Sequence, residues 1–189
     1  MQPLRNEILT WEDVDRLIDH LLPQFEVEFE AMLVITRGGI IPGGLLAEAM
    51  GLTHVLTAAV DFPAKMEMEK GNLGDLARRN TIKHEDILRP LMAWPQFIQF
   101  PEDRALRGRR TLVVDDVWGS GRTITAVKIR VSAAGGFPFT CVLHFNPHRN
   151  LFGSNRPDYY AAITDAYIIY PWEIDRGPDR IKLCDLDEM

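Results

Sequence analysis

Two acidic residues followed by a turn of small residues form the stretch of this sequence best suited to chemistry. The segment TLVVDDVWGSGRT spans residues 111–123, and in it an apolar run leads into Asp115 and Asp116 and then into a Gly-Ser-Gly turn. The apolar run predicts a buried strand, and ligands of open α/β sheets gather at the carboxyl ends of such strands. A helix that starts near Arg122 would point its first N–H groups and the positive end of its dipole into the turn. The pattern therefore predicts a phosphate-binding turn beside two carboxylates.

A pair of glycines follows another predicted strand, at residues 31–36. Here Arg37 precedes Gly38 and Gly39. Paired glycines allow backbone N–H groups to converge on an anion, and the arginine adds a permanent positive charge. Alone, this segment would be better interpreted as an ordinary strand-to-helix turn with a surface arginine. Together with the acidic stretch, it predicts a second anion site.

The two acids need a positive partner, because carboxylates beside a phosphate repel it. Either Mg2+ or the hydroxyls of a sugar can bind Asp115 and Asp116. Phosphoribosyl pyrophosphate (PRPP) carries a phosphate, a ribose diol and a metal-binding pyrophosphate, so it would satisfy every group. The alternatives are an ordinary strand-turn-helix connection or an unrelated nucleotide loop. A Walker A loop is excluded, because no Gly-Lys-Ser/Thr follows the glycines.

Both stretches resemble those of a known family. The run VVDDVWGSGRT looks like the PRPP-binding motif of type I phosphoribosyltransferases, in which two acids precede a small-residue loop that ends in Gly-x-Thr. The run ITRGGIIPGGLLAEAMG resembles the pyrophosphate loop and following helix of 6-oxopurine phosphoribosyltransferases, particularly the xanthine-guanine type. The resemblance implies transfer of the phosphoribosyl group from PRPP to a nitrogen base, with a purine as the expected acceptor, and release of pyrophosphate. It also implies a non-proline cis peptide bond between Thr36 and Arg37.

The resemblance further implies roles for individual residues. PRPP contacts are implied for Arg37, Gly38, Gly39, Asp115, Asp116, Trp118, Gly119, Ser120, Gly121, Arg122 and Thr123. Catalytic roles are implied for Arg37, Asp115 and Asp116. Mg2+ is the implied cofactor, with Asp115, Asp116 and Glu173 as its ligands. Contacts to the base are implied for Asn146, Tyr167 and Trp172.

Two positions depart from the pattern of the 6-oxopurine enzymes. Gly119 stands where the family has an Asp that serves the purine N7, and Asn146 stands where it has a Lys that donates to the 6-oxo group. A Lys ammonium only donates, whereas an Asn amide can donate or accept and so does not exclude an amino group. Two alternatives therefore stay open. One is a non-catalytic sensor of PRPP or a nucleotide on the same fold, and the other is a transferase for a non-purine base.

The elements that must position these residues alternate between strand and helix. Caps and periodicity predict helices at residues 10–22, 42–50 and from about 122 to 134, and strands at 31–36, 54–60, 112–114 and 139–145, with one or two short strands in 159–170. This alternation predicts an α/β fold with a parallel sheet. The resemblance implies one type I phosphoribosyltransferase domain over residues 1–189, an open parallel sheet flanked by helices with a small hood and a mobile loop. Residues 61–110 are expected to form the loop and hood insertion, and 174–189 an acidic tail.

Composition narrows the class of protein and its partners. The chain has 189 residues, 46% of them hydrophobic, which suffices for a single core. Its net charge of −6, from 21 basic and 27 acidic residues, argues against nucleic acid and anionic membranes as partners. The two cysteines have no metal-ligand spacing, and neither a membrane-spanning run nor the apolar core of a signal peptide is present, so a cytoplasmic protein is expected. The family's tendency to dimerise implies a homodimer or a higher homo-oligomer.

Overall fold

A sheet of six strands in the order β4-β3-β2-β5-β6-β7 forms the centre of the protein, and β1 and β8 make a separate two-stranded sheet. The computed structural model describes residues 5–62 and 95–174. The strands are β1 (Asn6–Ile8), β2 (Ala31–Ile35), β3 (Val55–Asp61), β4 (Gln96–Gln99), β5 (Arg110–Trp118), β6 (Phe137–Phe145), β7 (Tyr159–Ile163) and β8 (Tyr167–Ile169). The helices are α1 (Trp11–Leu21), a 3-10 turn η1 (Leu22–Gln24), α2 (Ile40–Met50), α6 (Asp103–Leu106) and α7 (Arg122–Ala133).

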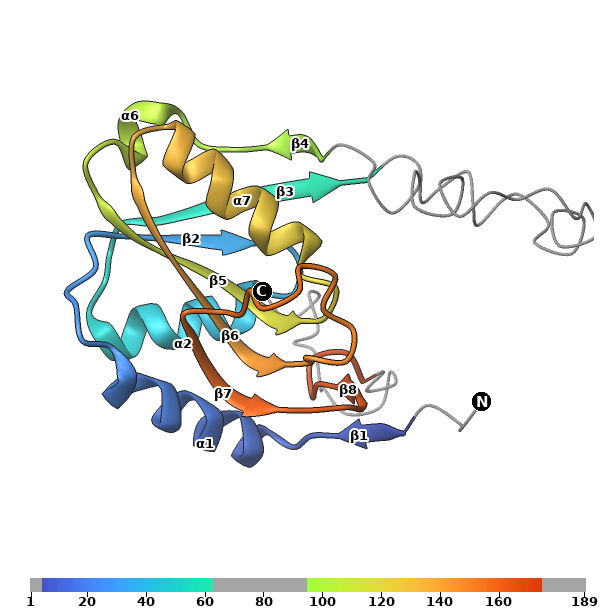
Figure 1. Cartoon of the computed structure of the whole chain (residues 1–189). Coiled ribbons are helices and arrows are strands. Elements are labelled where there is room, and N and C mark those ends of the chain that lie inside the picture. Colours follow the sequence, from blue (N-terminus) through green and yellow to red (C-terminus); the bar gives the residue numbers. More distant parts are fainter. Residues whose placement is uncertain (1–4, 63–94, 175–189) are drawn as a thin grey trace, which may run out of the picture.

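All neighbouring strands from β3 to β7 in the central sheet pair in parallel, and only the edge strand β4 is antiparallel to its neighbour β3. The carboxyl ends of the parallel strands therefore lie along one edge of the sheet, as the arrowheads in Figure 1 show. The expected α/β fold with a parallel sheet is confirmed. Its topology brings the loops after β2, β5 and β6 to one edge, although they are far apart in the sequence.

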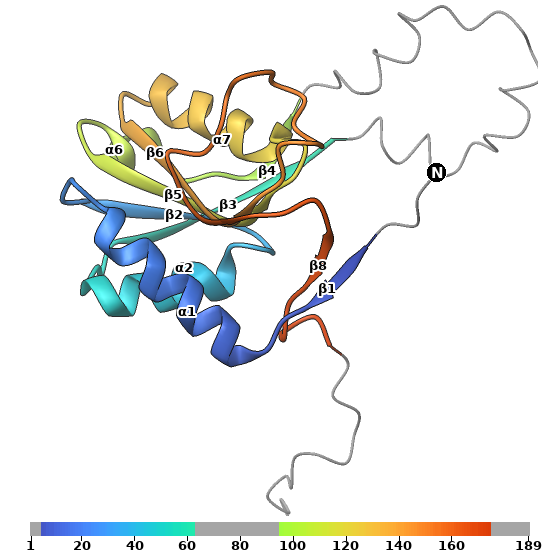
Figure 2. The same ribbon diagram turned by 60° about the horizontal axis from the view of Figure 1, so that its bottom comes forward.

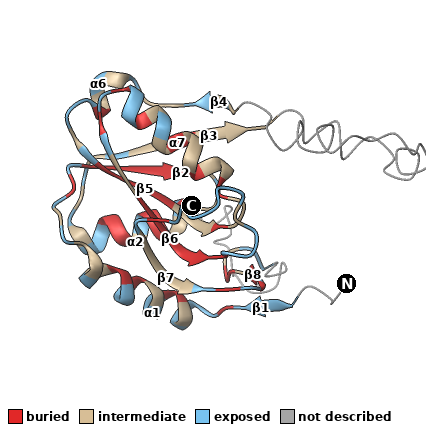
Figure 3. Cartoon of the chain, viewed as in Figure 1, coloured by how far each residue is buried: buried red, intermediate tan, exposed pale blue. Residues whose placement is uncertain are grey.

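Helices cover both faces of the central sheet (Figure 1). One core cluster joins α1 and α2 to the sheet, and a second joins α7 to the opposite face. Every residue of β2 is buried, as is the first half of β5 after Arg110. Figure 3 shows this buried centre in red. A strand that is covered on both faces must be apolar throughout, which is why these strands read as continuous hydrophobic runs.

Helix boundaries follow the capping signals in the sequence. Thr10 and Asp13 form a capping box at the start of α1, with the Asp13 N–H donating to Thr10 Oγ1 at 3.2 Å. Gly51 ends α2 in the left-handed conformation at φ 63°. Both boundaries agree with the prediction, as does the start of α7 at Arg122. Within the described ranges, no helix is long and apolar enough to cross a membrane.

The structure differs from the sequence prediction in three places. First, β5 continues to Trp118 and so includes both acids, because its ladder with β6 extends to the pair Trp118 and Phe145. Second, a small sheet pairs β1, which was not predicted from the sequence, with β8 from near the other end of the chain (Figure 2). Third, β4 and α6 from residues 61–110 belong to the main body. The expected mobile loop in residues 63–94 and the acidic tail from residue 175 onward lie outside the described residues.

Candidate functional site

The acid pair lies at the carboxyl end of β5, just beyond the last residue that pairs with β2, which is Val114. Each carboxylate is bonded to the backbone of the residue that follows it. The Asp116 N–H donates to Asp115 Oδ1 at 3.0 Å, and the Val117 N–H donates to Asp116 Oδ1 at 2.6 Å. These bonds hold both side chains close to the strand end, where a ligand on the sheet edge would meet them.

The electrostatics of the pair favour a positively charged or hydrogen-bonding partner. Burial raises the pKa of Asp115 well above its ordinary value, and the negative charge of Asp116 raises it further. Burial also raises the pKa of Asp116, and the nearby charge of Glu173 adds to the rise. Three carboxylates therefore repel one another at one end of the sheet. A bound cation, or a ligand that donates hydrogen bonds, would relieve this repulsion.

The carboxylates of Asp115, Asp116 and Glu173 could hold a metal ion if the substrate supplied the remaining ligands. Among the described residues, no group of three or more His, Cys, Asp and Glu side chains is arranged to hold a metal ion. Mg2+ in phosphate-transfer sites is commonly held by one or two carboxylates together with substrate phosphates. Asp115, Asp116 and Glu173 fit such a shared site, because they concentrate negative charge beside the place where a pyrophosphate would lie.

The first glycine loop packs directly onto the acid pair. The peptide bond between Thr36 and Arg37 is cis, as predicted, and Gly38 follows it. A Cβ atom on Gly38 would lie 2.5 Å from Asp116 Oδ1 and 2.7 Å from Asp115 Oδ1. A larger residue would force the carboxylates or the loop to shift, so glycine lets the backbone after β2 come close to the two carboxylates of β5. The Arg37 side chain is exposed and makes no ion pair with the described residues, so its charge remains available to an anion.

The second glycine loop is shaped by a tryptophan. Gly121 has φ 77°, and a Cβ atom on it would collide with the indole of Trp118. That indole is 3% exposed, packs edge-on against Phe145 and donates through Nε1 to Asn150 Oδ1 at 3.2 Å. The sequence prediction grouped Trp118 with the PRPP contacts. The buried indole of Trp118 packs beneath the loop at Gly121. A contact of Trp118 with PRPP would therefore be made by its backbone atoms.

Both helices that begin at this edge lack a side-chain cap. The N-cap residues are Gly39 in α2 and Gly121 in α7, and neither offers a side-chain acceptor to the first N–H groups. In α7, Ser120 Oγ accepts a long bond of 3.4 Å from the Arg122 N–H. The Arg122 guanidinium lies over the ring of Phe62, 4.2 Å from its centre. Two helix N-termini with glycine caps, at one sheet edge, suit a ligand with two anionic groups.

The residues predicted to contact the base lie in three separate segments, after β6, in β8 and in the turn that follows β8. Asn146 directly follows β6, is 2% exposed, and accepts the His148 N–H through Oδ1 at 3.1 Å. Tyr167 is half exposed on β8. Trp172 stacks on Tyr170 with ring centres 4.4 Å apart, so its indole is already partnered on one face. A contact of these side chains with a base stays a prediction.

Sequence reasoning missed Tyr170, which bonds to the backbone of the acid pair, and His144, which bonds to Tyr170. The Tyr170 hydroxyl donates to the backbone carbonyl of Asp116 at 3.1 Å, and His144 Nδ1 lies 2.8 Å from the same hydroxyl. Both residues sit in or next to predicted strands, where core packing is the ordinary expectation. Their separation of 26 residues follows no local spacing rule, so no sequence signal could have paired them.

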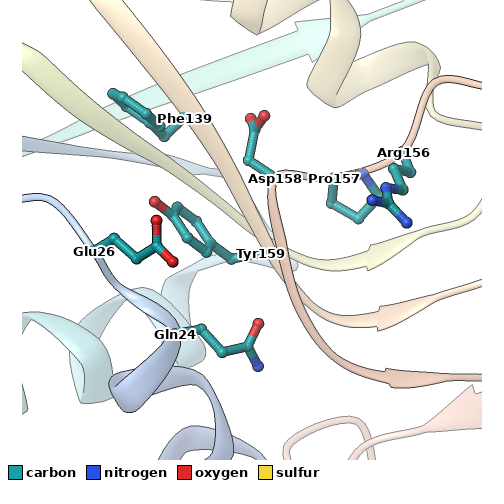
Figure 4. Close-up of a pocket in the computed structure, with 7 residues that line it drawn as sticks. All are labelled: Gln24, Glu26, Phe139, Arg156, Pro157, Asp158 and Tyr159. Atoms are coloured by element: carbon teal, nitrogen blue, oxygen red, sulfur yellow. The ribbon is translucent and has the colours of Figure 1, made fainter.

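A further hollow of about 590 Å³ opens where β7 begins (Figure 4). Phe139 and Tyr159 line it together with Glu26 and Arg156, and it shares no residue with the acid pair or the glycine loops. Asp158 at its rim is already bonded to Lys128 and to Thr140. It is therefore separate from the candidate site.

The fold and the site together define a class of protein. An acid pair that ends a central strand of a parallel sheet, with a glycine loop pressed against it and a second loop opening a helix, is the arrangement expected of a type I phosphoribosyltransferase.

Comparisons with known proteins agree with this class. No family model matches the chain. The chain is 25% identical over 177 residues to a xanthine-guanine phosphoribosyltransferase of Gluconobacter oxydans (strain 621H), which covers 91% of this chain and 87% of the relative. It superposes on a purine phosphoribosyltransferase from Pyrococcus horikoshii Ot3 with a TM-score of 0.66 and 25% identity, over 93% of this chain and 99% of that one. A protein from Neisseria gonorrhoeae, solved with bound ppGpp, matches with a TM-score of 0.65 and 20% identity over 100% and 95% of the two chains. In sequence and fold the chain is therefore similar to purine phosphoribosyltransferases.

Proposed function

We propose that this protein transfers the phosphoribosyl group of PRPP to a purine base and releases pyrophosphate. The observation that carries the proposal is the close approach of Gly38 to both carboxylates, because it brings the expected anion-binding loop to the acid pair at one sheet edge. The relatives named as xanthine-guanine and purine phosphoribosyltransferases support a purine as the acceptor.

In this reaction the bond from ribose C1 to pyrophosphate breaks, a bond from C1 to a base nitrogen forms, and the base gives up an N–H proton to the released pyrophosphate or to solvent. Positive charge develops on the ribose and negative charge on the leaving group, as in glycoside hydrolysis. Arg37 and the N–H groups near Gly39 would stabilise the pyrophosphate, and the loop before α7 would hold the 5′-phosphate. The carboxylates of Asp115 and Asp116 would accept the ribose hydroxyls and orient the sugar. No covalent intermediate with the protein is needed.

Mg2+ belongs to this proposal as a cofactor. When bound, it would neutralise charge on pyrophosphate. The repulsion among Asp115, Asp116 and Glu173 supports a cation at this place. We also propose a homodimer or higher homo-oligomer in the cytoplasm, which size-exclusion chromatography and cell fractionation would test. The buried, unpaired thiol of Cys141 is compatible with a reducing compartment.

The direct test measures pyrophosphate release from PRPP and Mg2+ while purine and pyrimidine bases are added one at a time. Calorimetry measures PRPP binding in the same preparation. Release that depends on a purine is the expected result and identifies the acceptor. Release with a pyrimidine alone would contradict the purine assignment, and the absence of PRPP binding would contradict the whole proposal.

A second candidate is a non-catalytic sensor of PRPP or a nucleotide. It is favoured by Gly119 and Asn146, which stand where the family resemblance implies a charged Asp and Lys. The Neisseria gonorrhoeae neighbour, which holds bound ppGpp, is consistent with nucleotide binding on this fold. PRPP or nucleotide binding without turnover of any base would favour this candidate over the transferase.

A further inference from the structure

Tyr170 lies where the acid pair, β6 and the turn that carries Glu173 meet. Its side chain is 1% exposed, and its ring stacks on Trp172 with an interplanar angle of 5°. Its hydroxyl lies within hydrogen-bond distance of the Asp116 carbonyl oxygen and of His144 Nδ1, at 3.1 and 2.8 Å. A tyrosine buried this deeply needs partners for its hydroxyl, and here one of them is the backbone of a candidate site residue.

The direction of these hydrogen bonds follows from the donors available. A carbonyl oxygen only accepts, so the single hydroxyl proton of Tyr170 is donated to Asp116. The hydroxyl oxygen must then accept from His144, which places a proton on Nδ1. Burial lowers the pKa of the His144 imidazole to about 4, so the ring is neutral at pH 7. The chain of bonds therefore runs from His144 Nδ1–H through Tyr170 O–H to the Asp116 carbonyl.

The backbone of Tyr170 reaches the third carboxylate. Its N–H donates to Glu173 Oε2 at 2.9 Å, and its carbonyl accepts the Glu173 N–H at 3.0 Å. The negative charge of Glu173 is felt at Asp116, whose pKa it raises. Tyr170 thus bonds to the main chain of Asp116 through its hydroxyl and to the side chain of Glu173 through its backbone N–H.

We propose that Tyr170 is a positioning residue for the reaction, with His144 as its support. Its hydroxyl fixes the backbone of the acid pair, and its backbone fixes Glu173, so the three carboxylates meet PRPP and its cation in one arrangement. This role rests on the proposed function. Tyr170 has no role in proton transfer in this proposal, because the hydrogen bonds of Tyr170 described above all join it to other protein groups.

The variant Tyr170→Phe removes only the hydroxyl and keeps the ring that stacks on Trp172. The Kd for PRPP in the presence of Mg2+ should rise about tenfold, because the buried Asp116 carbonyl and His144 Nδ1–H lose their partner. The KM for the base should stay within about twofold, since the bond lost is on the PRPP side. Tyr159→Phe is the matched control: its hydroxyl makes no hydrogen bond with the described residues, and its PRPP affinity should not change. A merely structural role would reduce the active fraction and leave Kd and KM alone.

A second measurement does not depend on substrate. In ¹⁵N NMR spectra the His144 ring should show a neutral Nδ1–H tautomer in the wild-type protein, and Tyr170→Phe should remove that preference. The variant His144→Asn, which retains a short side-chain donor, should keep PRPP affinity closer to wild type than His144→Leu does.

The outcomes separate this role from the proposed function. If the wild-type protein binds no PRPP, the proposed function fails and the positioning role fails with it. If the wild type binds PRPP but Tyr170→Phe binds it equally well, only the positioning role is overturned. A wild-type His144 with its proton on Nε2 would also overturn it, because the chain of bonds would then be absent.

Discussion

At the scale of single residues, the site depends on a glycine, Gly38, that has no Cβ atom. The space beside Gly38 is occupied by the two carboxylates of the acid pair, whereas a Cβ atom on Gly44, six residues later in α2, would have nothing within 4 Å. The two glycines lie on the same loop and helix, yet only one is required by its surroundings. This contrast gives a matched pair of variants.

The variant Gly38→Ala should lose PRPP-dependent activity by roughly 100-fold, because its methyl group forces the loop away from Asp115 and Asp116, and displacements near 1 Å have effects of that size. Steady-state kinetics with PRPP measures the loss. Gly44→Ala should keep full activity and gain about 1 kcal/mol in the free energy of unfolding, since alanine is the better helix former. Equal activity in the two variants would show that activity does not depend on the close approach of the Gly38 loop to Asp115 and Asp116.

The buried like charges of Asp115 and Asp116 should lower the free energy of unfolding, although they are needed to bind PRPP. The variant Asp115→Asn keeps an acceptor for the Asp116 N–H but removes one of the buried like charges. At pH 7 it should melt higher than wild type by about 2–4 °C for each kcal/mol gained, while PRPP binding is lost. Calorimetric melting measures the first effect and titration with PRPP the second.

The pH dependence of this difference has a definite sign. The folded pKa of Asp115 is raised, so the native state holds its proton while the unfolded chain releases it near pH 4. The wild type therefore loses this contribution to stability as pH rises from about 4 through the raised folded pKa. The advantage of Asp115→Asn should be small at pH 4 and grow toward pH 7. A difference that is constant with pH would contradict a raised pKa.

At the scale of elements, the loop between β5 and α7 holds one position that is open to change. Gly121 is fixed by its positive φ and by the Trp118 indole, whereas Gly119 has nothing within 4 Å of a Cβ atom. A side chain can therefore start at position 119 without displacing a neighbour.

The variant Gly119→Asp should raise turnover of 6-oxopurines by tenfold or more if the N7 partner is the group that is missing, because a positioned acid or base commonly contributes about 10²-fold or more. Gly119→Asn is the control, since it has the same shape but cannot exchange a proton. Rates with hypoxanthine, xanthine and guanine measure the effect. No gain with aspartate would indicate another acceptor, or a pocket that differs at further positions such as Asn146.

At the scale of the whole molecule, the site is assembled from segments that only the fold brings together. The loops after β2 and β5 meet at one sheet edge, and the small sheet of β1 and β8 joins the two ends of the described chain (Figure 2). A ligand that binds such a site stabilises the folded protein as a unit, because the unfolded chain has no site.

PRPP with Mg2+ at about 100 times its Kd should therefore add about 2.7 kcal/mol to the free energy of unfolding and raise the melting temperature by several degrees. Differential scanning calorimetry measures the shift. Adding a chelator should remove most of it, because the repulsion among the three carboxylates is then uncompensated. A shift that survives the chelator would indicate that PRPP binds without the cation.

The sequence by itself determined much of this protein. Local rules predicted α1 and α2 nearly to the residue, through Thr10 as the N-cap and Gly51 as the closing residue, and the family resemblance predicted the cis peptide after Thr36. Buried parallel strands were readable because both of their faces must be apolar. The two glycine loops and the acid pair were readable because their residue types suit phosphate and cation chemistry.

The tertiary structure decided what depends on distant partners. Pairing with β6 carries β5 past the acids to Trp118, and the pairing of β1 with β8 joins opposite ends of the chain. Trp118 looked like part of a ligand loop but is buried, and the bond from Tyr170 to Asp116 spans 54 residues. Local sequence rules act over a few residues. Contacts across a sheet are set by strand order and register, which no short segment contains.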